Sequence, residues 1–152
     1  MSAEARLWAE WRVALMKADP GADLTRIENA VQLGTPDVNG CVFRTDFWCE
    51  LKAMERWPKD PMAPLRIPHY TRNQRLWIRR RGKAGGRVFL LLRVTLPVHE
   101  WLLFGWEAAY AQVGNVPADE LRSLALVRSL GQFAMEPFRL ALRYDARTSP
   151  LH

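Results

Sequence analysis

Residues 34–52 read GTPDVNGCVFRTDFWCELK, in which two short apolar runs flank a polar turn at Arg44-Thr45. Apolar runs of this length around a short turn are typical of an antiparallel β-hairpin. An acid, Asp37, opens the first run, and the triplet Glu50-Leu51-Lys52 closes the second. The spacing therefore predicts three charged side chains on two adjacent strands.

A turn of even length sets which residues of the two strands lie opposite each other. The expected cross-strand pairs are Asp37–Lys52, Asn39–Glu50 and Cys41–Trp48. Directly opposed residues share a face, and side chains alternate along each strand. The polar residues and Trp48 should therefore point the same way. The other face should join the core, and it carries Val38, Val42, Phe47, Cys49 and Leu51.

Two carboxylates on neighbouring strands are hard oxygen ligands that suit Mg²⁺ or Mn²⁺. A metal bound by Asp37 and Glu50 would polarise a phosphate and help to generate hydroxide, and Lys52 would assist the attacking water or stabilise developing negative charge. The pattern predicts a metal site for phosphodiester hydrolysis. The alternative is a solvated strand face with an incidental Glu-Lys pair.

The residues Pro36-Asp37, Glu50-Leu51-Lys52 and Gln74 resemble the motif of the PD-(D/E)XK nuclease superfamily, and within it the phage-type VRR-NUC and archaeal Holliday-junction-resolvase branches. The resemblance covers roughly residues 4–94. It implies an α/β fold with a restriction-endonuclease-like core, in the order αβββαβ, whose mixed sheet is flanked by helices. We expect one nuclease domain over residues 1–152, with its core at about 4–104 and a helical C-terminal part at 105–145.

Two roles implied by the resemblance stay open at this point. The superfamily has a functional glutamine where Gln74 stands, which would bind the scissile phosphate or a metal-bound water, yet Thr71-x-x-Gln74 also fits a capping box that starts a helix. The superfamily also has a further acid before Asp37. We favour Glu28 as this third catalytic and metal-binding acid, with Glu4 and then Glu10 as alternatives.

Periodicity and punctuation outline the other elements. Leu7, Trp8, Trp11 and Leu15 have helical spacing, and a proline-rich loop after Lys52 has no apolar period. Expected helices span 3–17, 71–81, a segment ending at 112, one starting at 117, and one around 138–142. Expected strands beyond the hairpin span 24–29, 88–94 and 100–104.

The net charge is +6, and the basic residues are unevenly distributed. No acid occurs between Arg66 and Arg93. A solvated helix face normally mixes both signs, so a block of one sign favours contact with phosphates over a merely solvated surface. We expect a DNA-binding surface formed by Arg72, Arg75, Arg79, Arg80, Arg81, Lys83 and Arg87.

No apolar stretch is long enough to cross a bilayer, and the first residues lack the pattern of a signal peptide, so we expect a cytoplasmic protein (the host cytoplasm if it is viral) with no membrane partner. The two cysteines, Cys41 and Cys49, should face opposite sides of the hairpin and stay unpaired.

These observations and the resemblance predict a Mg²⁺-dependent DNA endonuclease, with a role in phage replication, recombination or repair. It would act on branched or structured DNA. Paired cuts in a four-way junction favour a homodimer with two-fold symmetry. One alternative is a catalytically inactive nuclease fold that serves as a DNA-binding accessory protein. Another is a small regulator that binds a host protein through the Trp- and Pro-rich loop.

Overall fold

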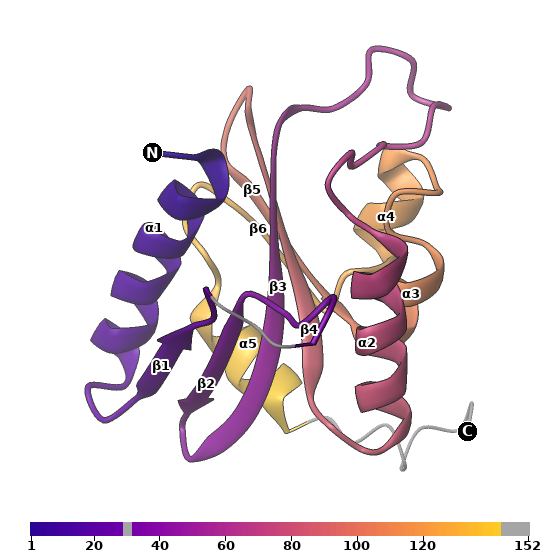
Figure 1. The fold of residues 1–152 in the computed structure, drawn as a ribbon. Helices are drawn as coiled ribbons and strands as arrows, with labels where there is room; N and C mark the ends of the chain where they lie inside the picture. The colour runs from indigo at the N-terminus through magenta and orange to yellow at the C-terminus, as the bar shows by residue number, and fades with distance from the viewer. Residues whose placement is uncertain (29–31, 144–152) are drawn as a thin grey trace.

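The computed structural model describes residues 1–28 and 32–143, and six strands in this part form one sheet. Their order across the sheet follows the chain order, β1 to β6 (Figure 1). Neighbouring strands are antiparallel except β3 and β4, which run parallel. The strands are β1 (Asp23–Arg26), β2 (Val38–Val42), β3 (Thr45–Arg56), β4 (Val88–Leu96), β5 (Glu100–Gly105) and β6 (Val127–Leu130).

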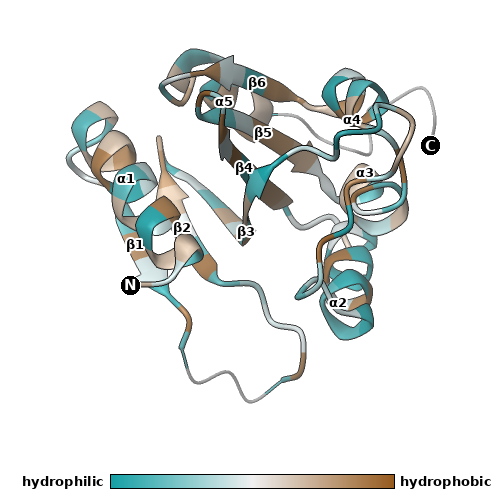
Figure 2. Ribbon diagram, turned by 90° about the horizontal axis from the view of Figure 1, so that it is seen from above, coloured by the Kyte–Doolittle hydropathy of each residue, from teal (hydrophilic) through white to brown (hydrophobic). Residues whose placement is uncertain are grey.

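Helices cover both faces of the sheet. They are α1 (Ala3–Ala18), α2 (Arg72–Lys83), α3 (Trp106–Ala111), α4 (Ala118–Leu124) and α5 (Met135–Leu142). Side chains of α1 and α5 pack in one core cluster, and those of α2, α3 and α4 pack in the other. Seen from above, α1 stands on one side of the sheet and α2, α3 and α4 on the other (Figure 2). The first six elements have the expected order αβββαβ.

The parallel pair β3–β4 lies at the centre of the sheet and requires a crossover, which α2 supplies. β4 is buried over its first seven residues, because both of its faces are covered. Any polar side chain on the same stretch of β3 is therefore also placed inside the molecule. No helix among the described residues is long and apolar enough to span a membrane.

The first helix shows how the sequence determines one of the two cores. Ser2 caps α1, since its Oγ accepts a hydrogen bond from Ala5 N at 3.1 Å. One turn apart, Leu7, Trp11 and Leu15 are fully buried on the sheet side of α1. The helical spacing seen in the sequence thus corresponds to a buried face of α1.

The predicted register of the β2–β3 hairpin was wrong by two residues. Val38 pairs with Cys49, and Val42 pairs with Thr45, so the turn consists of Phe43 and Arg44 and not of Arg44 and Thr45. Both turn residues have positive φ, 52° and 64°, as a tight two-residue turn requires. A contact far away in the sequence supports this turn: Phe43 N donates to Asp19 Oδ2 at 2.7 Å.

A two-residue shift preserves the two faces, because side chains alternate with a period of two. The predicted core residues of the hairpin are all buried, and Cys41 and Cys49 are both free, as expected. The shift does change which polar residues meet. One step beyond the Val38–Cys49 pair, Asp37 comes level with Glu50 and not with Lys52.

Other elements also differ from the expectation, most clearly at three places. β1 ends at Arg26, so Glu28 lies beyond the strand, and Asn29 lies outside the described residues. β3 continues past Lys52 to Arg56. The C-terminal part contains the predicted helices and also a short strand, β6, that the sequence did not reveal, because only Val127 of its four residues is buried.

Candidate active site

The segment before β2 is packed tightly against the start of α2. Gly34 has φ +82°, and a Cβ at this position would lie 2.2 Å from the carbonyl oxygen of Asn73. Only glycine therefore fits here. Pro36 is buried, and Ile27 N donates to the carbonyl of Asp37 at 2.7 Å. These contacts fix the backbone of Asp37 between β1 and β3.

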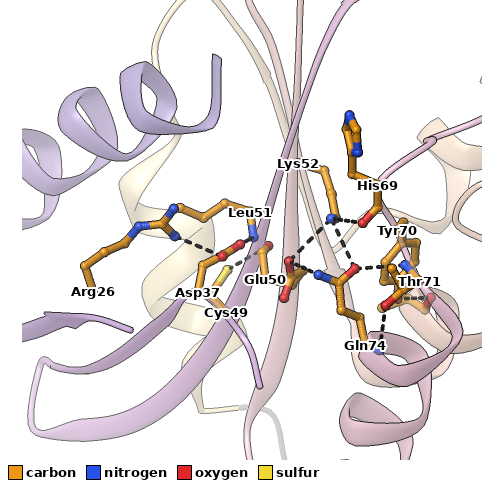
Figure 3. Close-up of polar contacts among 11 residues, drawn as sticks. Arg26, Asp37, Cys49, Glu50, Leu51, Lys52, His69, Tyr70, Thr71 and Gln74 are labelled. Carbon is orange, nitrogen blue, oxygen red and sulfur yellow. Dashed lines mark hydrogen bonds and ion pairs between the residues drawn. The ribbon is translucent and has the colours of Figure 1, made fainter. Parts of the chain in front are cut away.

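Asp37 has both carboxylate oxygens in contact with the protein. Its Oδ2 accepts a hydrogen bond from Leu51 N at 2.8 Å, and its Oδ1 lies 3.1 Å from Arg26 Nη1 (Figure 3). The side chain is one-quarter exposed. The bond to the β3 backbone orients the carboxylate toward Glu50, and the arginine balances its charge.

Glu50 is 1% exposed, which is unusual for a carboxylate. Its Oε1 accepts from Gln74 Nε2 at 3.1 Å and lies 3.5 Å from Lys52 Nζ. Its Oε2 is buried and has no hydrogen-bond partner among the described residues. Burial, followed by the negative charge of Asp37, raises the pKa of Glu50 to about 9, and the opposing effect of Lys52 is smaller.

Lys52 is 4% exposed, and its ammonium group is held from several sides. Nζ donates to the His69 carbonyl at 2.8 Å and to Gln74 Oε1 at 3.2 Å, and it lies 5.5 Å from the centre of the Tyr70 ring. The Tyr70 hydroxyl is itself fixed, because it donates to the Ala109 carbonyl at 2.6 Å. The cation is thereby held beside Glu50.

Gln74 has the capping role that its sequence position allowed, and its side chain also contacts two charged residues of β3. Thr71 and Gln74 form a complete capping box, in which Gln74 Oε1 accepts from Thr71 N at 2.9 Å. The same oxygen accepts from Lys52, and the amide nitrogen donates to Glu50 (Figure 3). One glutamine thus starts α2 and joins the two charged groups of β3.

The donor set fits a divalent cation. A buried carboxylate oxygen without a partner is costly, and a cation with hard-ligand preferences would satisfy it. Glu50 Oε2 and the oxygens of Asp37 are the donors available for such an ion. An ion placed there would compete with Arg26 for Asp37 Oδ1 and would favour the ionised form of Glu50.

The raised pKa of Glu50 predicts that the metal-free protein becomes less stable as pH rises. The ordinary pKa is near 4.5 and that of the folded state is about 9, so the folded state holds a proton that the unfolded state releases. This stabilisation is fully present below about pH 4.5 and is lost as pH rises through 9. We expect the melting temperature in EDTA to fall by on the order of 5 °C more in the wild type than in Glu50→Gln between pH 5 and pH 9.

Differential scanning fluorimetry across this range measures the effect, and added Mn²⁺ should restore the melting temperature of the wild type at high pH. Parallel curves for the wild type and Glu50→Gln would show that Glu50 is ionised in the folded protein throughout.

The third acid is not assembled with the other two. Glu28 is exposed, two residues beyond the end of β1. Glu4 lies in the first turn of α1, and Glu10 pairs with Arg93 under that helix, on the sheet face opposite Glu50. Among the described residues, no group of three or more His, Cys, Asp or Glu side chains could hold a metal ion.

The basic block divides into two kinds of residue. Arg75 donates to the carbonyls of Ala109, Tyr110 and Val113 at the end of α3, and Arg87 Nε donates to the Leu142 carbonyl at the end of α5. Arg75 thus ties α2 to the end of α3, and Arg87 ties the start of β4 to the end of α5. Arg81 lies over the rings of Trp48 and Trp77, and Arg79 lies over Tyr110. The side chains exposed to solvent include Arg72, Arg80 and Lys83.

Two contributors to the site had no sequence signal that pointed to them. Arg26 reaches Asp37 from β1, and the only hint was its place on a short strand before the Gly34-Thr35-Pro36 turn. Tyr70 and the carbonyl of His69 hold Lys52 from the end of the proline-rich loop, where no periodicity places them. Arg26 and the Tyr70 segment reach the site through contacts between residues that are far apart in the sequence.

Comparison with known proteins supports the fold. No family model and no curated protein matches this sequence. Among solved structures, the chain is similar to Hjc, a Holliday junction resolvase of the archaeal hyperthermophile Archaeoglobus fulgidus, with a TM-score of 0.54 and 17% identity. The match covers 80% of this chain and 93% of that one.

The expected fold class is therefore confirmed: a mixed six-stranded sheet flanked by helices, with the restriction-endonuclease-like arrangement of Hjc. The resolvase side of the sequence resemblance is supported at the level of the fold. The VRR-NUC side has no support among these matches. At this level of identity the likeness concerns the fold and not the activity.

Proposed function

We propose that this protein is a Mg²⁺- or Mn²⁺-dependent DNA endonuclease that acts on branched or otherwise structured DNA. The observation that carries the proposal is the buried, unpartnered Oε2 of Glu50 beside Asp37, with Lys52 held against the same carboxylate. Most buried carboxylate oxygens in structural ion pairs are hydrogen-bonded, and an unsatisfied one beside a second acid is the kind of atom that a divalent cation would bind. The Hjc-like fold supports DNA as the substrate.

Each residue has a distinct part in this proposal. Asp37 and Glu50 would hold the ion, which supplies Lewis-acid polarisation of a phosphate oxygen. Lys52 would stabilise the negative charge that develops on the phosphate in the transition state. Gln74 positions Lys52 and Glu50 relative to each other through its two amide atoms. Arg26, once displaced from Asp37 Oδ1, would remain beside the bound phosphate as a counter-charge.

The test is incubation of the purified protein with linear, nicked, single-stranded and four-way DNA, with Mg²⁺, with Mn²⁺ and with EDTA. The proposal requires cleavage that depends on the metal, with four-way DNA preferred. A small domain has little surface for reading bases, so backbone shape and charge should dominate recognition. Paired cuts at a junction would further favour a two-fold homodimer.

A second candidate is a DNA-binding accessory protein that has the fold but does not cleave. The observation that favours it is the Arg26–Asp37 ion pair, together with the separation of Glu28, Glu4 and Glu10 from the other acids. Salt-sensitive DNA binding without cleavage in either metal would select this candidate.

We expect the exposed cations of α2 to bind the DNA backbone. Changing Arg72, Arg80 and Lys83 together to Gln should weaken binding to all DNA substrates alike. Each lost phosphate contact should also reduce the magnitude of the slope of log affinity against log salt concentration by roughly 0.9 on duplex DNA. Fluorescence anisotropy at several salt concentrations measures both effects.

The matched control is the triple change of Arg6, Arg12 and Lys17 to Gln on α1, which also removes three exposed cations, but from a helix that covers the opposite sheet face. Equal losses from both triple variants would mean that only net charge matters and that α2 is not a specific surface.

A further inference from the structure

The loop between β3 and α2, residues 57–71, projects beyond the rest of the molecule (Figure 1). Contacts within this chain hold the loop. Met62, in its outer part, is 75% exposed. An exposed apolar side chain on a projecting loop has no packing role within this chain.

The outer part of the loop is stiff. Asp60 Oδ1 accepts from Met62 N at 2.9 Å, and the carbonyl of Asp60 accepts from Ala63 N at 3.1 Å. Prolines at positions 58, 61 and 64 fix the backbone φ around this turn. The acid is thus used inside the turn, and the turn fixes the backbone at Met62.

The base of the loop is fixed by a buried ionic group. Trp57 Nε1 donates to Glu100 Oε1 at 2.9 Å, and Glu100 is 4% exposed. Arg122 and Arg128 each donate to Glu100 Oε2 at 2.8 Å, and the Arg122 guanidinium lies 4.5 Å from the Trp57 ring centre. These contacts tie the loop to β5, β6 and α4.

The far end of the loop runs directly into the candidate active site. Pro64 forms an isolated β-bridge with Pro117, and Leu65 N donates to the Val116 carbonyl. The segment of the loop that leads back toward α2 is therefore also fixed. The carbonyl of His69 then accepts from Lys52 Nζ. The exposed cations along this path are Lys59, Arg66 and Arg72.

We propose that Met62 is a wedge that enters an unstacked base step of DNA at a branch point, nick or bulge. This inference rests on the proposed DNA function and specifies the substrate within it. An unbranched apolar side chain fits between bases, and apolar wedges of this kind open base steps in DNA-bending proteins. The stiff loop loses little conformational freedom on insertion, and the basic residues at its base would hold the adjoining phosphates.

The strand geometry predicts where the cut falls. Six residues of β3 separate Glu50 from Arg56, where the loop begins, and this corresponds to about 20 Å along the strand. With the DNA axis along β3 and about 3.4 Å per base pair, the cleaved bond should lie about six nucleotides or more from the opened step. A protein that recognises the discontinuity with Met62 therefore cuts at a distance from it.

The experiment uses 2-aminopurine, whose fluorescence rises when it is unstacked, placed at the branch point of a four-way junction and in a continuous duplex. EDTA is present, so that no cleavage occurs. We expect a several-fold rise at the branch point with the wild type and with Met62→Leu, and none with Met62→Ser. Met62→Ser should also bind the junction on the order of tenfold more weakly, with duplex binding unchanged.

Leu140→Ser is the matched control, since Leu140 is an exposed apolar residue on α5, 67% exposed, away from the loop. It should behave as the wild type. Equal 2-aminopurine fluorescence with Met62→Ser and with the wild type overturns the wedge. That result is expected if the loop tip contacts a protein or a lipid surface instead of DNA. The protein could also unstack the base in a way that depends on Met62 and yet cleave none of the DNA substrates. This result would support the wedge and rule out the nuclease proposal.

Discussion

Cleavage by Asp37→Asn and by Glu50→Gln is expected to fall by at least on the order of 10³-fold, while DNA binding survives. Each change removes one ligand charge from the centre, and the Lewis-acid contribution of a catalytic metal amounts to several kcal/mol. Neither change touches the exposed cations of α2. Single-turnover cleavage in Mg²⁺ and anisotropy in EDTA measure the two quantities separately.

The control for this result is Glu55→Gln, an exposed carboxylate on the same strand, which should cleave as the wild type does. Calorimetric titration with Mn²⁺ supplies a readout that does not depend on activity, and both site variants should bind the ion more weakly. Full cleavage in either site variant would remove the metal centre from the proposal.

Lys52→Met is expected to lower turnover by on the order of 10²-fold or more with little change in Mn²⁺ affinity. Methionine keeps an unbranched side chain at this buried position but removes the ammonium that contacts Glu50, the His69 carbonyl and Gln74. If Lys52 stabilises charge that appears only in the transition state, kcat falls and KM changes little.

Lys17→Met, an exposed lysine on α1, serves as the control for loss of one positive charge. Far-ultraviolet circular dichroism and the melting temperature of Lys52→Met show whether the variant is folded. A folded Lys52→Met with normal turnover would assign the lysine to structure alone.

Local patterns predicted single elements of the central fold, and their order αβββαβ came from the family resemblance. Alternation over 38–52 predicted the faces of the β2–β3 hairpin, and helical spacing predicted α1. The register failed because the turn at Phe43 and Arg44 depends on Asp19, which lies 24 positions from Phe43 in the sequence. β6 was missed because an edge strand with one buried residue leaves no apolar alternation.

The candidate site was only partly visible for the same reason. Asp37, Glu50 and Lys52 share a hairpin, and their spacing alone placed them on one face. The residues that orient them, Arg26 and Tyr70, come from β1 and from the end of a loop. The basic block was visible as composition, but the sequence could not separate the guanidinium groups that hold helices from those that face solvent.

The double use of Gln74 links the beginning of α2 to the integrity of the site. The first turn of a helix is its least stable part, and it opens locally more often than the helix interior. Whenever this turn opens, Thr71 N and Gln74 N lose their partners, and Lys52 and Glu50 lose their contacts with Gln74 at the same moment. Amide exchange at the start of α2 therefore reports the fraction of time for which Gln74 is in contact with the charged groups of β3.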